Sequence, residues 1–148
     1  MTFEAMLASF HLVAILALVT FMSSQAALCR IEWMNAAVIE RLVRLDTIYQ
    51  ATVVAVLASG LVRILWGIKG ASWYATQPML HLKVTLFVVM VLLSIAPTLA
   101  FRRWRRNLRA HGALPGADEV RKMRRLIMVQ SHVLPVVAVI AVFWARGW

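Results

Sequence analysis

Two histidines lie about one turn into long apolar segments of the chain. His11 stands in FHLVAILALV, and His81 occupies the matching place in LHLKVTLFVV. An ionisable side chain is costly in hydrocarbon, so each of these histidines is a candidate for function. Two neutral imidazoles that face each other across a helix bundle can hold a haem iron from both axial sides. We therefore expect His11 and His81 to bind haem b; the alternative is that each bonds water or a carbonyl at the membrane interface.

Two cations are predicted at a depth similar to that of these histidines. Arg63 precedes Trp66 by about one helical turn, and Lys83 follows His81 by two positions. They could neutralise an anionic ligand such as the propionates of a porphyrin, for which arginine offers a bidentate fork. The alternative is that both side chains snorkel to the membrane surface.

A third histidine, His132, stands apart from this pair. It follows Arg125 by seven residues, which places it about 10 Å into the membrane and roughly 20 Å in depth from His11 and His81. One iron cannot use all three side chains. We expect His132 to form a hydrogen bond inside the bundle, with a second metal or proton site, or a small-molecule carrier function at this level, as alternatives.

Other chemistries have little support in the sequence. No nucleophile, zinc-protease or nucleotide-binding motif is present. The single cysteine, Cys29, rules out an internal disulfide, and the methionines are too scattered for a copper site. All six carboxylates are expected at span ends or in loops, namely Glu4, Glu32, Glu40, Asp46, Asp118 and Glu119. If the protein is an enzyme, a membrane oxidoreductase is therefore expected rather than a hydrolase.

The elements that must position these residues are membrane spans. The chain has 148 residues, 62% of them hydrophobic, and a mean hydropathy of +0.79. Lipid permits only helices or closed barrels, and no alternating strand pattern occurs. We predict an all-α, integral membrane four-helix bundle in a single domain, 1–148. Its four apolar runs, each able to cross a core of about 30 Å, cover roughly 3–28, 45–67, 79–101 and 126–145.

The distribution of basic residues predicts the orientation. Nine of the sixteen lysines and arginines fall in the loop 102–125, three arginines fall in 29–44, and only Lys69 falls in 68–78. By the positive-inside rule, the first and third connections are cytoplasmic and both termini lie outside. We expect a multi-pass protein of the bacterial inner membrane whose basic loop contacts anionic lipids rather than nucleic acid. A homodimer is also expected, because four short spans enclose little interior.

The two halves of the chain align weakly with each other. The segment around His11 aligns with that around His81, and the second and fourth spans align at a constant offset of 80. Two helical hairpins related by a pseudo-twofold axis along the membrane normal would explain this pattern. We also expect three glutamines near the inner ends to bridge helices by hydrogen bonds, namely Gln25, Gln50 and Gln130.

The whole chain resembles an uncharacterised bacterial family of four-span membrane proteins of unknown function. The segments FHLVAILALV, QAALCR, HLKVTLF and PTLAFRRWRR carry this resemblance. More distantly, the chain is similar to HemJ-type protoporphyrinogen oxidases in its early histidine, His11, and in Trp73, His81 and Lys83 at the start of the third span. That resemblance implies haem b and porphyrin oxidation coupled to a quinone or respiratory acceptor. The end of the third span, SIAPTLAF, lacks the histidine of the HemJ pattern.

A different class of function is the alternative to this redox role. The chain would then be a non-enzymatic subunit or assembly factor of a larger membrane complex, or a CopD-like metal-handling protein. The two classes differ in one simple property, because only the first predicts a haem spectrum for the purified protein.

Overall fold

Four long helices dominate the part of the chain that the computed structural model describes, residues 2–66, 72 and 76–145. They are α1 (Thr2–Leu28), α2 (Ala36–Trp66), α4 (Pro78–His111) and α5 (Ala117–Ala145), and a short 3-10 helix, η1 (Ile31–Trp33), follows α1. Each of the four is long and apolar enough to cross a membrane. No strand occurs in these residues. The predicted all-α, four-span fold is confirmed.

Three of the helices extend beyond the predicted spans. α2 begins at residue 36 rather than 45, α4 ends at 111 rather than 101, and α5 begins at 117 rather than 126. The charged residues that bounded the apolar runs are themselves good helix formers, so the helices continue past the hydrocarbon. α4 ends where Gly112 adopts a left-handed conformation (φ 65°) and donates its N–H to the Leu108 carbonyl.

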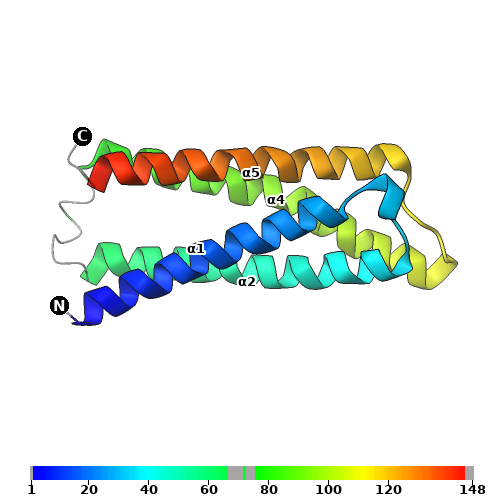
Figure 1. Cartoon of the computed structure of the whole chain (residues 1–148), viewed down its shortest axis with the longest axis horizontal. Coiled ribbons are helices and arrows are strands. Elements are labelled where there is room, and N and C mark those ends of the chain that lie inside the picture. Colours follow the sequence, from blue (N-terminus) through cyan, green and yellow to red (C-terminus); the bar gives the residue numbers. More distant parts are fainter. Residues whose placement is uncertain (1, 67–71, 73–75, 146–148) are drawn as a thin grey trace.

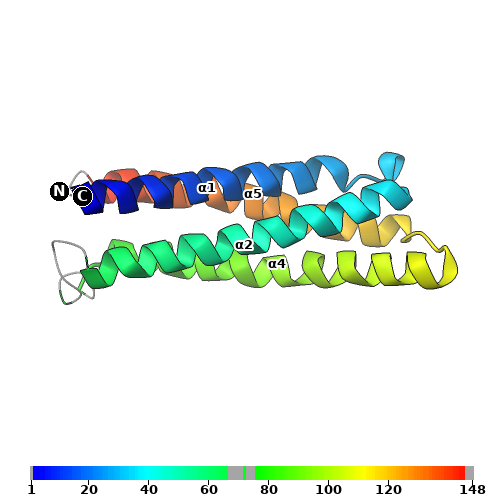
Figure 2. The ribbon, with the colours of Figure 1, turned by 90° about the horizontal axis from the view of Figure 1, so that it is seen from below.

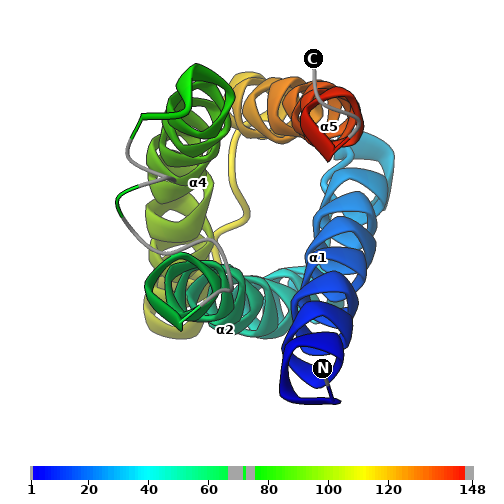
Figure 3. The same cartoon turned by 90° about the vertical axis from the view of Figure 1, so that its left-hand side faces the viewer.

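The helices form a ring in the order α1, α2, α4, α5 (Figure 3). α1 begins and α5 finishes at one end of this bundle, which we call the terminal end (Figure 1). The opposite end, which we call the basic end, carries η1 and the connection between α4 and α5. Seen from below, α2 lies in front of α4 and α1 in front of α5 (Figure 2), so each hairpin contacts the other along both of its helices.

The core is concentrated toward the basic end. On α1 the first fully buried residue is Ala14, and on α4 it is Met90; on α2 the last is Ser59, and on α5 it is Leu134. Beyond these limits, no described side chain is fully buried at the terminal end. The backbone agrees with this pattern, because α1 runs from beside α2 at the terminal end toward α5 at the basic end (Figure 3).

The helix order is the one that the predicted pseudo-twofold repeat requires. An axis along the bundle exchanges α1 with α4 and α2 with α5, and it converts the α2–α4 contact into the α5–α1 contact; both contacts are present. The polar interior departs from this symmetry. Gln50 bonds to α4, whereas its predicted mate, Gln130, accepts a hydrogen bond from Tyr49 of α2. The duplication itself stays a prediction.

The packed half of the bundle should be the more sensitive to truncation. Leu42 of α2 is fully buried (0% exposed), whereas Leu57 of the same helix is 47% exposed. We expect Leu42→Ala to lower the free energy of unfolding by about 2–5 kcal/mol, because it leaves a cavity among the helices. The matched Leu57→Ala should change it by no more than about 0.5 kcal/mol. Steric trapping in bicelles would measure both; equal effects would contradict the packing described here.

Candidate functional site

His11 is held against α2 at the terminal end of the bundle. Its Nδ1 atom lies 2.7 Å from Ser59 Oγ, and the side chain is half-buried. The neighbouring residue, Gly60, permits this approach, because a Cβ atom there would lie 3.4 Å from His11 Cε1. A side chain longer than alanine at this position would therefore press on the imidazole.

The hydrogen bonds of Ser59 assign the tautomer of His11. Ser59 Oγ donates its only proton to the Ala55 carbonyl at 2.6 Å. In the other tautomer the Ser59 hydroxyl would donate to Nδ1 instead, but in this arrangement Ser59 Oγ accepts the proton on His11 Nδ1, and the lone pair of the neutral ring lies on Nε2. This is the arrangement in which a histidine can bind a metal through Nε2 while its other nitrogen is fixed by a second residue.

The two predicted cations belong to the same region. Arg63 and Lys83 are both close enough to His11 to interact with it electrostatically, and they interact with each other. The structure therefore brings together three of the four residues predicted for a ligand site. The fourth, His81, is exposed on α4, the helix diagonally across the ring from α1. Trp73, which belongs to the resemblance, lies outside the described residues.

His132 is placed differently from the prediction. It is exposed on α5, and its Nδ1 lies 2.6 Å from the Met128 carbonyl of its own helix. It borders a shallow, mostly apolar groove with Arg125 and Leu86. The expected hydrogen bond is present, but the expectation that His132 points into the bundle is wrong, because the buried face of this turn is occupied by Gln130 and Leu134.

A buried polar network crosses the packed half of the bundle. At its centre, Asp46 of α2 is 3% exposed, and its Oδ1 atom accepts a hydrogen bond of 2.8 Å from Thr98 of α4. Gln25 of α1 approaches the same oxygen at 3.5 Å. Gln50 donates to Thr98 at 2.9 Å and to Ser94 at 3.3 Å. Three helices are therefore joined through one carboxylate.

The fourth helix joins through an adjacent contact. The Tyr49 hydroxyl donates to Gln130 Oε1 of α5 at 3.1 Å, and both side chains are buried. The prediction that Gln25, Gln50 and Gln130 bridge helices is confirmed. Such bonds stabilise helix association in lipid, where water cannot replace them.

Asp46 stands near the start of the second apolar run, where a carboxylate at a span end was expected, but the structure shows that its side chain is buried. Because α2 begins at Ala36, Asp46 lies ten residues inside this helix and faces the other helices of the bundle. A periodic signal could have found it. The buried positions of α2 recur every three or four residues, and Asp46 falls on that stripe: Val38, Ile39, Leu42, Val43, Asp46, Tyr49, Val53, Val56 and Ser59. A carboxyl group so placed can hold a proton or remain charged through its donors.

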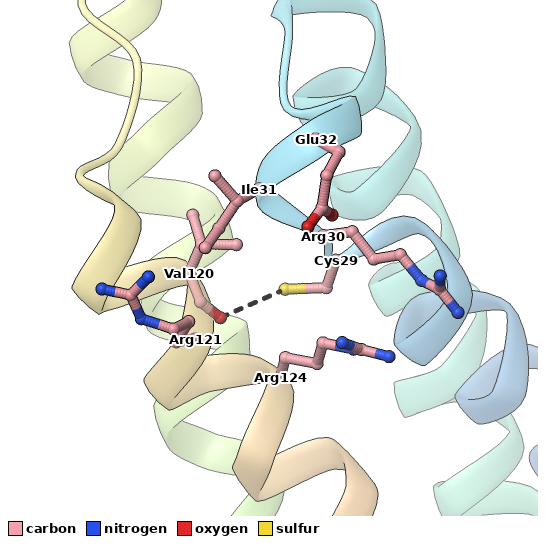
Figure 4. A pocket seen from close by; sticks show the side chains of 7 residues that line it. All are labelled: Cys29, Arg30, Ile31, Glu32, Val120, Arg121 and Arg124. Carbon is pink, nitrogen blue, oxygen red and sulfur yellow. Dashed lines mark hydrogen bonds between the residues drawn. The ribbon is translucent and has the colours of Figure 1, made fainter.

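At the basic end, Cys29 lies in a pocket between η1 and α5. The thiol is fully buried, and its Sγ contacts the Val120 carbonyl at 3.9 Å (Figure 4). Burial raises the pKa of Cys29 to about 12, although the charge of the nearby Arg124 acts in the opposite direction. Among the described residues, no group of three or more His, Cys, Asp or Glu side chains forms a metal site.

Fold and polar interior together define a polytopic helical membrane protein with ionisable groups inside its bundle. A family model described as "Predicted membrane protein (DUF2214)" matches residues 3–148, and the chain belongs to this family. That description names no activity. Comparisons with curated proteins and with solved structures found no match.

Replacing Asp46 should destabilise the bundle, and the loss should be larger when the new side chain has no oxygen to accept hydrogen bonds. Asp46→Leu leaves Thr98 and Gln25 without an acceptor, so we expect a loss of about 1–3 kcal/mol in the free energy of unfolding. Asp46→Asn keeps one oxygen and should lose less. The exposed Asp118→Asn, which breaks a surface pair with Arg121, should cost at most about 1 kcal/mol. Unfolding by steric trapping would test this order, and an unchanged Asp46→Leu variant would refute it.

The Cys29 thiol should be inert in the folded protein. Because its pKa is raised to about 12, the reactive thiolate is absent at lower pH, and burial blocks access as well. Labelling with N-ethylmaleimide should stay negligible and should not rise between about pH 7 and pH 9, where an ordinary thiol ionises.

Denaturation in dodecyl sulfate should expose Cys29 and permit full labelling. Cys29→Ser/Ala110→Cys moves the thiol to an exposed position of α4 and should label rapidly in the folded state. Stoichiometric labelling of native Cys29 at neutral pH would show that the thiol itself is accessible, contrary to its burial.

Proposed function

We propose that this protein binds haem b near the terminal end of its bundle and uses it in a redox reaction, either porphyrin oxidation or electron transfer to a quinone. The observation that carries the proposal is the contact of His11 Nδ1 with Ser59 Oγ at 2.7 Å. With the ring proton on Nδ1 and directed at Ser59, Nε2 is the unprotonated nitrogen that can ligate iron.

The surroundings of His11 suit an anionic, planar ligand. Arg63 and Lys83 provide positive charge beside the imidazole, and such cations pair with the carboxylates of propionates. No described side chain is fully buried at this end, so a ligand would not have to displace a packed core. The contact with Ser59 holds the ring against α2, which fixes its direction.

The residues that would hold haem are therefore His11 and His81, which would ligate its iron, and Arg63 and Lys83, which would pair with its carboxylates. His81 is exposed on α4. When bound, haem supplies one-electron chemistry. The role of the chain is to position it: Ser59 fixes the His11 ring, and the two cations stabilise the negative charge of the ligand.

The non-enzymatic alternative uses the same fold without a cofactor. A subunit, an assembly factor or a CopD-like metal-handling protein would need the bundle only as a membrane scaffold. In that case His11 joins α1 to α2 through its contact with Ser59. Its replacement would then affect assembly or metal tolerance, and the purified protein would show no haem spectrum.

We further propose an orientation in the bacterial inner membrane with the basic end in the cytoplasm and both termini outside. The concentration of arginine on the extensions of α4 and α5 supports it, since positive residues are retained on the cytoplasmic side. The same surface would contact anionic lipids. A homodimer is part of this proposal as well, because large apolar side chains such as Leu61 and Val139 are exposed on the outer faces of the helices.

Absorption spectra of the detergent-purified protein, oxidised and dithionite-reduced, test the cofactor. The wild type should show a sharp reduced α-band that His11→Ala and His81→Ala each abolish or shift. Ser59→Ala frees the imidazole and should weaken haem retention by about tenfold or more, since residues that orient a ligand are worth that much. Gly60→Leu should displace the ring and act similarly.

The control is His132→Ala, which removes an exposed histidine remote from Ser59 and should leave the spectrum unchanged. A colourless wild type after expression with ample haem would overturn the proposal and favour the non-enzymatic alternative. Loss of the band in His132→Ala with retention in His11→Ala would also overturn it.

A further inference from the structure

The pocket at the basic end is independent of the haem proposal and has its own chemistry. Its volume is about 250 Å³, several times the roughly 30 Å³ that a water molecule takes in the liquid. Two short segments form its walls, residues 29–32 after α1 and residues 120–124 in the first turns of α5. The pocket therefore lies directly beyond Leu28, the last residue of the first helix that is long and apolar enough to span a membrane.

Two of its arginines carry buried donors that nothing in the structure satisfies. The Nε atoms of Arg30 and Arg124 are buried and have no hydrogen-bond partner. A buried N–H group without an acceptor is rare in folded proteins and calls for an explanation. Figure 4 shows the two side chains extending side by side, with both guanidinium groups on the same side of the pocket. Two parallel cations of this kind repel each other unless an anion lies with them.

The other groups around the pocket compensate this positive charge only in part. Arg121 lies on the opposite side of the Cys29–Val120 contact and pairs with Asp118. Glu32 is the acidic residue of the lining, so the lining as a whole has three arginines against one carboxylate.

Neither Arg30 nor Arg124 forms an ion pair among the described residues. Arg30 is instead held in place by Trp33, whose ring centroid lies 5.2 Å from the guanidinium carbon. Its guanidinium is thus oriented without being neutralised.

We propose that this pocket binds a phosphate group, with Arg30 and Arg124 as its ligands. A guanidinium matches the geometry of a phosphate in a bidentate fashion, and its Nε–H is one of the donors used in that pairing. The two Nε–H groups, which are buried without a partner, would turn toward the phosphate oxygens when the ligand binds. Cys29 takes no part as a charged group, because its thiol stays protonated. The phosphate belongs either to the headgroup of an anionic lipid at the membrane surface or to a soluble ion.

Thermal unfolding of the full chain in nanodiscs tests the site and separates the two sources. One series uses phosphatidylcholine nanodiscs titrated with inorganic phosphate against chloride at equal ionic strength; the other replaces part of the lipid by phosphatidylglycerol. A bound ligand raises Tm in proportion to its concentration relative to Kd. We expect at least one series to stabilise the wild type. Stabilisation by phosphatidylglycerol alone identifies a lipid, and stabilisation by inorganic phosphate identifies the ion itself as sufficient.

Matched variants decide whether the pocket is responsible. Arg30→Gln and Arg124→Gln should each lower the apparent affinity, read from the ligand-dependent rise in Tm, by about tenfold. Arg124→Lys keeps the charge but loses the Nε–H donor, so it should lower the apparent affinity too. Arg106→Gln removes an equal charge from an exposed position of α4 and should behave as the wild type.

The Tm of each variant in phosphatidylcholine nanodiscs without phosphate reports whether that variant is folded. If Arg30→Gln or Arg124→Gln does not fold, the other of these two variants and Arg124→Lys decide the outcome. No stabilisation in either series, or equal loss in Arg106→Gln and the pocket variants, would overturn the proposal.

Discussion

The Asp46 carboxylate imposes the main constraint on the arrangement of these helices. A carboxyl group buried between helices must be surrounded by hydrogen-bond donors, since apolar side chains provide none. Thr98 of α4 and Gln25 of α1 converge on it, and Gln50 fixes Thr98 in turn. These bonds set the mutual rotation of three helices. Packing at the basic end follows from them, because the same faces that carry the polar groups carry the buried apolar side chains.

The two ends of the bundle differ in how tightly their side chains are packed. The basic end combines buried apolar residues with a satisfied polar network, whereas no described residue is fully buried at the terminal end. Helices that are held firmly at one end can diverge at the other without losing the fold. His11, Arg63 and Lys83 lie at the divergent end, which is where a bundle can admit a ligand at the least cost in packing.

Charge is used in different ways along the same chain. Asp46 and Tyr49 are enclosed by neutral donors and acceptors, so their role is to join helices. The arginines of the basic end remain outside the core, where some pair with carboxylates across helices, as Arg109 does with Glu40 at 2.8 Å. Arg30 and Arg124 differ from these surface pairs, since their Nε atoms are buried without an acceptor.

The sequence alone determined the four spans and the all-α fold, because apolar runs of about twenty residues can only be helices in lipid. It also placed His11, Arg63 and Lys83 at similar depth, since rise per residue is constant in a helix. Depth does not specify direction around the helix axis or the partners on other helices. Only the tertiary structure decided that Ser59 orients His11, that His132 is exposed, and that Asp46 is buried. The bounds of the apolar run did not reveal that Asp46 is buried, because α2 begins well before that run does; only the spacing of the apolar positions along the whole helix carries that signal.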